Sequence, residues 1–259
     1  MKQAPPEVHA LLKNITVSLR NILGANLTGV YLYGSLTQDA FDPERSDIDC
    51  LVVTQGELSD KEFTELGNSL VLLRSSNPWT EQLQMQFLLR DEVLVMNSKS
   101  CLYQFGKLGR GSSDGNPIFW MNILKSGVVL FGQPPSEFVP EITPRILHEA
   151  LVRETGYLRE EIENPLSEWR DVPKYRAYAV LTLCRILYSH ATGEIASKPE
   201  AANFVINNLP EDLQEVVRTA LGAASDKDAK YSVNIPLERI GQFVELTMQL
   251  LRGLKESGN

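Results

Sequence analysis

The sequence predicts an α+β fold: a mixed β-sheet flanked by helices, followed by an α-helical bundle. In the first half of the 259-residue chain, short runs of β-branched and aromatic residues alternate with amphipathic helical stretches. From residue 143 onward, apolar residues recur only at helical spacing. Gly132-Gln133-Pro134-Pro135 separates the two patterns. We therefore expect two domains, at residues 1–140 and 141–259.

The chain up to residue 89 is expected to hold two helices and three strands. Both helices are amphipathic, and the second begins at the capping box Ser59-Asp60-Lys61-Glu62. The strands are rich in β-branched, aromatic and long apolar side chains. In chain order these elements are a helix over residues 6–24, strands over 30–33 and 47–53, a helix over 59–74, and a strand over 83–89.

The segment over residues 90–141 is less regular. Its stretch GKLGRGSSDG, residues 106–115, is rich in Gly and Ser and predicts a loop. It lacks the G-K-[ST] ending of a phosphate-binding loop, which argues against that function. Residues 118–130 predict a helix leading into a short apolar strand at 128–131.

Beyond residue 143 the helical pattern continues to the end of the chain. Polar and Pro-containing runs separate the helices, and one of them, residues 165–173, carries Trp169 and Asp171. Ser197-Lys198-Pro199-Glu200 is a second capping box. The expected helices cover residues 143–164, 174–191, 198–209, 210–221 and 236–254.

Composition and charge limit the kinds of molecule that we expect this protein to bind. The formal net charge is −8 at pH 7. Proteins that bind nucleic acids usually need a basic face, so we expect no nucleic-acid partner. An acidic surface instead attracts small cationic molecules. No run approaches the ~18 apolar residues of a membrane span, and the start of the chain does not resemble a signal peptide. We expect a cytoplasmic monomer with no membrane partner.

The cysteine pattern agrees with a cytoplasmic location. Cys50, Cys101 and Cys184 lie far apart and form no C-x-x-C pair. This spacing indicates neither a zinc site nor a disulfide framework. We expect three reduced thiols in the core.

The most informative stretch covers residues 29–54, GVYLYGSLTQDAFDPERSDIDCLVVT. Gly34 lets the backbone turn after the first strand and approach a ligand closely. Asp47 and Asp49 are two positions apart on the next strand, so they project from the same face. Two aspartates on a surface strand are often only solvated. Here apolar residues enclose the pair and a Gly-Ser turn precedes it, which favours Mg²⁺ bound together with a nucleoside triphosphate.

This arrangement resembles the signature of the DNA polymerase β-type nucleotidyltransferase superfamily. The signature consists of Gly34-Ser35, a spacer of eleven residues, and Asp-x-Asp between strands. The resemblance implies that a nucleoside monophosphate is transferred from a triphosphate to an acceptor hydroxyl through two Mg²⁺ ions.

The superfamily normally places a third carboxylate on the strand beside Asp-x-Asp. Here the corresponding face of the strand over residues 83–89 carries Gln84 and Gln86, and Glu81 has the opposite parity. An amide can orient a hydroxyl but cannot accept its proton near neutral pH. Because general-base catalysis contributes typically ~10²–10⁴-fold, its loss predicts a slow enzyme rather than an inactive one.

The second half of the chain narrows the resemblance. YAVLTLCRILYSHATGEIASKPEAANFVINNLP, residues 178–210, is similar to the helical domain of the aminoglycoside adenylyltransferases that modify streptomycin and spectinomycin. The resemblance implies ATP as the co-substrate, with contacts from both domains across an interdomain cleft. The residues it implies are Asp47 and Asp49 for Mg²⁺, Gly34, Ser35 and Ser46 for the triphosphate, and Arg185 and Lys198 for the ATP phosphates.

Two departures from that family concern the acceptor and the chemistry. The catalytic Glu of the family corresponds to Gln84, and the acidic residue that receives streptomycin falls near Tyr175. Trp169 and Asp171 are the candidate substrate contacts, an aromatic surface and a negative charge for a cationic drug.

The sequence as a whole favours a Mg-ATP-dependent nucleotidyltransferase that transfers AMP to a hydroxyl of an aminoglycoside or aminocyclitol. One alternative is a nucleotide-binding homologue with weak or no catalysis, in which Gln84 is natural or engineered. Another is adenylylation of a different acceptor, such as a protein side chain or tRNA, although the acidic charge disfavours tRNA.

Overall fold

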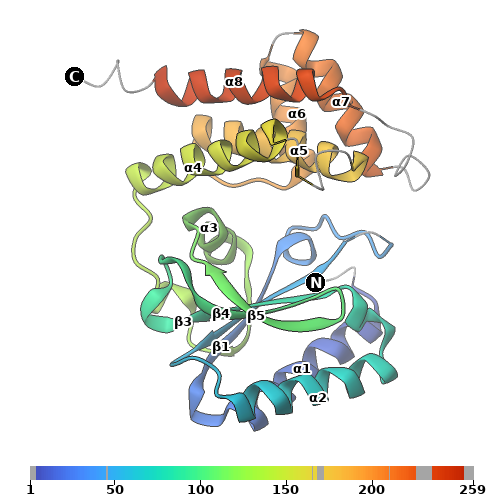
Figure 1. Ribbon diagram of the computed structural model, residues 1–259, viewed down its shortest axis with the longest axis vertical. Coiled ribbons are helices and arrows are strands. Elements are labelled where there is room, and N and C mark those ends of the chain that lie inside the picture. Colours follow the sequence, from blue (N-terminus) through green and yellow to red (C-terminus); the bar gives the residue numbers. More distant parts are fainter. Residues whose placement is uncertain are drawn as a thin grey trace. The chain divides into compact units, whose positions relative to one another are not determined.

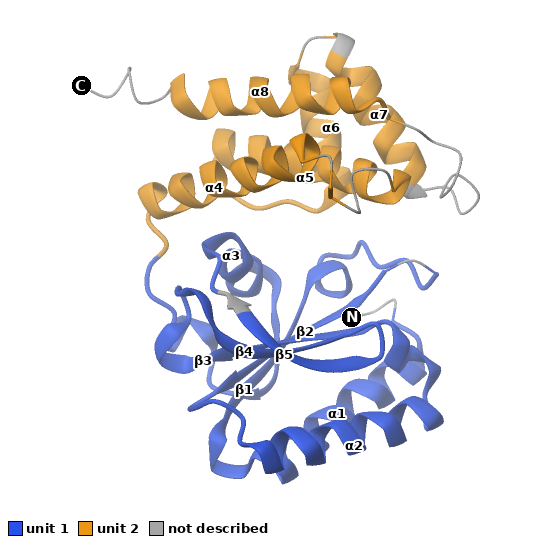
Figure 2. Ribbon diagram, in the orientation of Figure 1, with its two compact units in different colours: residues 1–141 blue, residues 142–259 orange. Residues whose placement is uncertain are grey.

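The structure is a computed structural model that describes residues 4–44, 46–164, 166–167, 172–209, 211–225 and 235–253. The chain divides into two compact units, Met1–Glu141 and Ile142–Asn259 (Figure 1, Figure 2). The first contains a six-stranded sheet with helices, and the described part of the second is helical. The predicted α+β fold class is confirmed.

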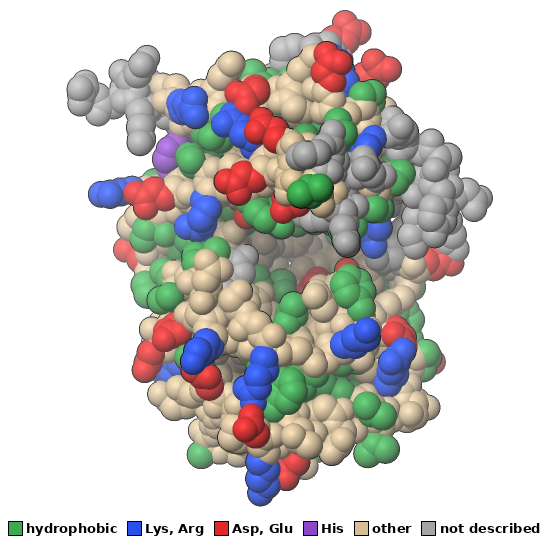
Figure 3. Space-filling view, viewed as in Figure 1, with side chains coloured by type: hydrophobic (Ala, Val, Ile, Leu, Met, Phe, Trp, Pro, Cys, Tyr) green, Lys and Arg blue, Asp and Glu red, His purple; other side chains and the backbone are tan. Residues whose placement is uncertain are grey.

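The surface carries charges of both signs. On the face drawn in Figure 3, Lys and Arg side chains are interspersed with Asp and Glu side chains. That face has no large region of Lys and Arg alone, which is the arrangement that binding to a nucleic-acid backbone requires.

The sheet of the first unit is mixed, with the strand order β5-β4-β3-β2-β1-β6. β2 and β3 are parallel, and the other neighbouring pairs are antiparallel. A parallel pair needs a long crossover, which α2 (Asp60–Ser76) supplies between β2 and β3. The strands are β1 (Leu27–Tyr33), β2 (Ile48–Thr54), β3 (Leu83–Leu89), β4 (Met96–Gln104), β5 (Lys107–Asp114) and β6 (Val128–Gly132).

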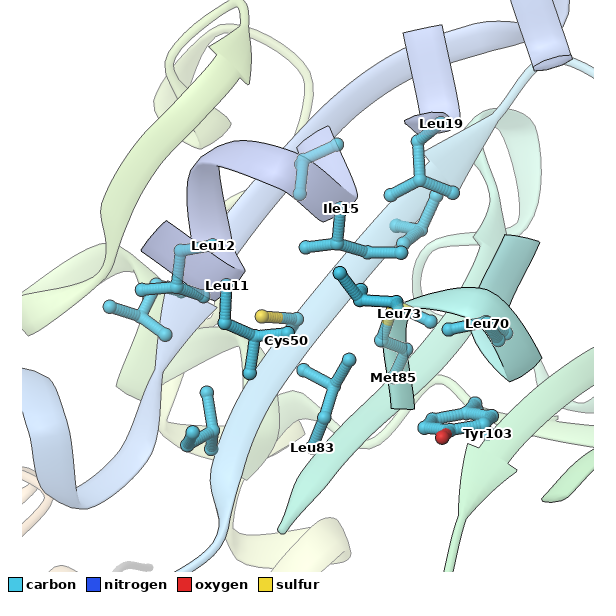
Figure 4. Close-up of a cluster of buried hydrophobic side chains, with 14 of the residues drawn as sticks. Leu11, Leu12, Ile15, Leu19, Cys50, Leu70, Leu73, Leu83, Met85 and Tyr103 are labelled. Atoms are coloured by element: carbon cyan, nitrogen blue, oxygen red, sulfur yellow. The ribbon is translucent and has the colours of Figure 1, made fainter. Parts of the chain in front are cut away.

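The main hydrophobic cluster of the first unit lies on one face of the sheet, and the buried Trp120 lies on the other. Figure 1 shows α1 (Pro6–Leu23) and α2 on the side of this cluster and α3 (Pro117–Ser126) on the other. Ile48, Cys50 and Val52 of β2 are fully buried on the α1 and α2 side. Because side chains alternate along a strand, the residues between them project toward α3. The labelled members of the core in Figure 4 are Leu11, Leu12, Ile15, Leu19, Cys50, Leu70, Leu73, Leu83, Met85 and Tyr103.

The predicted loop over residues 106–115 is wrong, because Lys107–Asp114 form β5 at the edge of the sheet. Phe105 and Gly106 connect β4 to β5 with φ values of 51° and 71°, and positive φ at both positions is typical of the tightest hairpins. An edge strand pairs with one neighbour through its backbone, so Gly and Ser side chains are tolerated. The local composition therefore indicated a loop where long-range pairing makes a strand. β4, within the segment expected to be irregular, is not predicted either.

The second unit is organised around α5 (Pro173–Thr192), which contacts the other helices of its described part. Contacts on several sides explain why the sequence of α5 is apolar around most of its circumference. The capping box predicted at Ser197 is present, with both of its hydrogen bonds. The other helices are α4 (Pro144–Glu163), α6 (Lys198–Asn208), α7 (Glu211–Ser225) and α8 (Leu237–Gly253), and the structure confirms all five predicted helices.

The three cysteines are buried and form no disulfide. Burial raises the pKa of the Cys184 thiol to about 12, and it also raises the pKa values of Cys50 and Cys101. Their thiols therefore stay protonated and unreactive near neutral pH. The prediction that all three thiols lie in the core is confirmed. Among the described residues, we find no helical stretch with the length and hydropathy of a membrane span.

His190 on α5 predicts a pH dependence of stability. Its ring centroid lies 6.3 Å from that of His148 on α4. Burial, and secondly the neighbouring His148, lower the pKa of His190. The unfolded chain, whose imidazole pKa is about 6.5, therefore binds a proton more readily than the folded protein does. Stability should be lost as the pH falls through about 6.5, because protonation then favours the unfolded chain.

Thermal unfolding at about pH 7.5 and about pH 5.5 tests this expectation. Between these values, the Tm of the wild type should fall more than the Tm of His190→Asn, whose side chain does not titrate. His9, which is exposed on α1, supplies the control, and His9→Asn should follow the wild type. An equal fall in all three proteins would show that His190 does not contribute.

Candidate active site

The two aspartates of the central stretch lie at the start of β2. Ile48 is fully buried in the core, so Asp49 projects from the opposite face, where it is half-buried. Asp47 immediately precedes the first residue of the strand and is exposed. The strand predicted to begin at Asp47 thus begins one residue later, and Asp47 belongs to the loop that enters it.

Asp49 has a polar neighbour on each adjoining strand. In the antiparallel pairing of β1 with β2 it lies opposite Tyr33, and in the parallel pairing of β2 with β3 it lies beside Gln84. Residues paired in this way project from the same face of a sheet. Leu83 and Met85 belong to the core on the other face. The register confirms the prediction that Gln84 shares a face with Asp49.

Gly34 brings the backbone directly against the Asp49 carboxylate. Its φ of +78° lies in a region that L side chains rarely adopt. A Cβ atom placed on Gly34 would lie only 2.3 Å from Oδ2 of Asp49. The glycine is therefore required both by the turn and by the close approach. It begins a short 3₁₀ turn, Gly34–Thr37, that also contains Ser35.

Ser46 shapes the loop that delivers Asp47. Its hydroxyl oxygen accepts a hydrogen bond of 2.9 Å from the Asp42 backbone N–H. Its own N–H donates to the Asp42 carbonyl at 2.8 Å. These two bonds close a tight turn just before Asp47, so Ser46 has a structural function in addition to any contact with a ligand.

The donor set fits a hard divalent cation. Asp47 and Asp49 supply carboxylate oxygens from one short segment, and Gly34 leaves space beside the second of them. Within the described ranges, no three or more His, Cys, Asp or Glu side chains are grouped so that they could hold a metal. A cation bound here would take one or two carboxylates from the protein and complete its shell with water and phosphate oxygens, as Mg²⁺ prefers.

Glu81, the nearest upstream acid, does not join the Asp49 face. Its carboxylate forms an ion pair with Arg74 at the end of α2. Two pockets of the first unit, of about 100 and about 480 Å³, are also lined by other residues, from β2–β5 and from α2 with the β4–β5 hairpin respectively. The candidate site is therefore formed by the Gly34 turn and the start of β2 rather than by either of these pockets.

The structure brings Arg185 and Lys198 to the same segment of the second unit. Arg185, half-buried on α5, donates from Nε to the carbonyl of Ala196 at 3.2 Å. Lys198 is the first residue of α6, and its Nζ lies 5.1 Å from the centroid of the Tyr178 ring. Arg185 thus contacts the loop between α5 and α6, and Lys198 begins the helix that follows this loop.

The predicted acceptor contacts cannot be placed. Trp169 and Asp171 lie outside the described residues. Tyr175 lies in the first turn of α5 and is 39% exposed.

Sequence patterns assigned no role to α3, yet this helix contacts both sides of Gly34-Ser35. The Phe119 ring packs edge-on against the Tyr33 ring, with centroids 4.7 Å apart. Asn122 accepts a hydrogen bond from Gln38. These partners are more than eighty residues apart, so no local motif could have indicated them.

Two known domain families match successive parts of the chain. Residues 13–99 match a nucleotidyltransferase domain. Residues 137–249 match the C-terminal domain of aminoglycoside adenylyltransferases. The first contains the candidate site, and the second contains Arg185 and Lys198.

Curated relatives align with most of the chain. The spectinomycin 9-adenylyltransferase of Campylobacter jejuni is 27% identical over 224 residues, which cover 80% of this chain and 83% of the relative. An aminoglycoside (3'') (9) adenylyltransferase of Escherichia coli is 28% identical over 244 residues, which cover 85% of this chain and 88% of the relative.

A solved structure has the same fold. It is the spectinomycin adenyltransferase from Enterococcus faecialis, crystallised with ATP and spectinomycin. The alignment has a TM-score of 0.69 at 19% identity and covers 94% of this chain and 99% of the other. Since both domain families match in order, and since relatives align along most of their length, this chain is an aminoglycoside adenylyltransferase-like protein.

Proposed function

We propose that the protein transfers AMP from Mg-ATP to a hydroxyl group of an aminoglycoside or aminocyclitol antibiotic, such as spectinomycin or streptomycin. Such a transfer would confer resistance to the modified drug. The observation that carries the proposal is the position of Asp49 between Gly34 and Gln84, in a chain whose two halves match the two adenylyltransferase domains.

In this proposal the polar groups of the first unit hold the nucleotide. Asp47 and Asp49 would bind Mg²⁺, and the superfamily implies two ions. The metal would neutralise phosphate charge and favour attack by the acceptor oxygen. Gly34, Ser35 and Ser46 would contact the triphosphate. Gly34 suits this role because its backbone can approach a ligand closely.

Gln84 would orient the acceptor hydroxyl without removing its proton. Its amide can donate to and accept from a hydroxyl, but it is not a base near neutral pH. We therefore expect slow transfer that depends on positioning and on the metal. Trp169 and Asp171 are proposed to contact a small cationic acceptor.

Pyrophosphate release tests the proposed reaction. Purified protein should be incubated with ATP, Mg²⁺ and a panel of aminoglycosides and aminocyclitols. We expect release only when a suitable drug is present, together with a drug product heavier by one AMP. Reactions without drug and reactions with chelated metal are the controls. No release with any drug at high protein concentration would refute the proposal.

Arg185 and Lys198 are proposed to bind the phosphates of ATP. Arg185→Ala and Lys198→Ala should each raise the KM for ATP about 10- to 150-fold, because a hydrogen bond to a charged group contributes about 1.5–3 kcal/mol. Steady-state kinetics at saturating acceptor would measure this effect. Arg218→Ala, at an exposed position of α7, is the control and should leave the KM unchanged. A lower Tm with an unchanged KM for ATP would instead assign both cations a structural role.

A second candidate function is nucleotide binding with weak or no catalysis. The register of β2 with β3 favours it, because the amide of Gln84 lies where a third carboxylate would complete the site. Calorimetry would then detect binding of Mg-ATP, while no drug would give turnover. Detectable transfer to any drug of the panel would favour the first proposal.

A further inference from the structure

One face of α3 contacts the chain before and after the Gly34-Ser35 turn. Residues three and four apart on a helix lie on the same face. The α3 residues on this face are Phe119, Asn122 and Ser126, and their partners are Tyr33, Gln38 and Thr37 respectively.

α3 itself is firmly held in the first unit. The side chain of Trp120 is fully buried, and its indole N–H donates to the carbonyl of Val93. The Trp120 ring also packs against Phe138, with centroids 5.8 Å apart. A helix fixed in this way provides a rigid surface against which a short turn can be aligned.

Asn122 fixes the end of the turn. The amide Nε2 of Gln38 donates to Oδ1 of Asn122, whose side chain is almost completely buried. The Nδ2 of Asn122 donates in turn to the Ile118 carbonyl at 3.3 Å. Both polar atoms of the buried amide are thus satisfied, and loss of Gln38 would leave one of them unpaired.

The hydroxyls of Thr37 and Ser126 link α3 to the Gly34 carbonyl. The Thr37 hydroxyl donates to the Gly34 carbonyl at 2.9 Å. Its oxygen lies 3.3 Å from the oxygen of Ser126. Ser126 also lies 3.2 Å from its own acceptor, the Asn122 carbonyl, so either hydroxyl can be the donor between Thr37 and Ser126. The Thr37 hydroxyl thus lies between Ser126 of α3 and the backbone carbonyl of Gly34.

We infer that Thr37 and Ser126, together with Gln38 and Asn122, are positioning residues that hold the Gly34-Ser35 turn against Asp49. The inference rests on the proposed function, because Mg-ATP is the ligand whose binding the turn governs. The backbone at Gly34 lies in direct contact with the Asp49 carboxylate. Movement of the turn would therefore displace a group for the triphosphate and a group for the metal at the same time.

Thr37→Val removes the hydroxyl and keeps the side-chain shape, whereas Thr37→Ser keeps the hydroxyl. We expect Thr37→Val to weaken Mg-ATP binding about 3- to 10-fold, the loss of one hydrogen bond, and Thr37→Ser to bind nearly as the wild type does. Calorimetry measures the affinity. In turnover assays, the KM for ATP should rise and the KM for the acceptor should not. A purely structural role would lower the Tm and would not single out ATP.

Matched substitutions on α2 control for the loss of a hydrogen bond from a side-chain hydroxyl to a nearby backbone carbonyl. Thr64 on α2 donates to the Asp60 carbonyl at 2.7 Å, so Thr64→Val removes a similar bond away from the turn. Ser75→Ala on α2 matches Ser126→Ala, because both hydroxyls donate to a carbonyl four residues earlier. The α2 variants should bind Mg-ATP as the wild type does, and Ser126→Ala should bind about 3- to 10-fold more weakly.

Amide hydrogen exchange tests the positioning role without relying on the proposed function. Amides of residues 34–38 should exchange about 3- to 10-fold faster in Thr37→Val than in Thr37→Ser, with or without nucleotide. If the wild type does not bind Mg-ATP, the proposed function fails, and the exchange rates alone decide the positioning role. If the wild type binds but both Thr37 variants bind equally well or equally poorly, the inference is overturned and the function stands.

Discussion

Gln84→Glu should raise the rate of adenylyl transfer at least about tenfold, and general-base catalysis allows ~10²–10⁴-fold. The substitution preserves side-chain shape and replaces an amide with a group that accepts a proton. It acts beside the carboxylate proposed to bind the metal, because residue 84 is the β3 neighbour of Asp49. The measurement is kcat at saturating ATP and acceptor. If the wild type is inactive, the gain should appear as the onset of turnover.

The pH profile of Gln84→Glu and a matched variant show whether the new carboxylate acts as a base or only adds a negative charge. The rate of Gln84→Glu should fall at acid pH as the new carboxylate is protonated, and its pKa should be raised by the nearby Asp49 carboxylate. The wild type lacks this titrating group at residue 84. Gln86→Glu adds the same charge to the same face of β3, but beside Leu51, and should give no gain. Equal rates for both variants would show that residue 84 is not at the base position.

Gly34→Ala should reduce kcat/KM about 10²-fold or more, since small displacements of a reacting group can have this effect. The added Cβ would lie 2.3 Å from Oδ2 of Asp49, so the carboxylate must rotate away or the turn must shift. Either movement would separate Asp49, the proposed metal ligand, from the backbone proposed to contact the triphosphate. Binding of Mg-ATP by calorimetry and turnover by pyrophosphate release would both report the loss.

Gly193→Ala tests whether the effect of Gly34→Ala comes from the collision with Asp49 or from backbone strain. Gly193 caps α5 with a φ of +72°, close to the +78° of Gly34, and an added Cβ there would meet no atom within 4 Å. Backbone strain should therefore cost both variants a similar amount of stability, about 1 kcal/mol. Only Gly34→Ala should also lose activity. A comparable loss of activity in Gly193→Ala would attribute the effect to stability.

The parts of the fold that were predicted correctly are those with short-range signals. The capping boxes at Ser59 and Ser197 mark helix starts, and both are present in the structure. Alternation along residues 83–89 identified β3 and correctly separated Gln84 from the core residues Leu83 and Met85. These signals act between residues at most four positions apart, so a single sequence contains them completely.

The parts that could not be predicted depend on distant partners. β5 has the composition of a loop, and it is a strand because β4 supplies its hydrogen bonds. The contacts of α3 with the Gly34 turn join residues more than eighty positions apart. A short stretch of sequence does not specify which strand will lie beside it. It also does not specify which face of a helix will contact a turn far away in the chain.

For the candidate site, the sequence by itself determined the kinds of groups present: a Gly-Ser turn, two aspartates two positions apart, and an amide where the superfamily has a carboxylate. Only the tertiary structure decided that Gly34 lies against Asp49, that Gln84 is the strand neighbour of Asp49, and that α3 contacts the turn. The physical reason is that side-chain chemistry belongs to each residue, whereas proximity results from strand register and packing, which the folding of the whole unit determines.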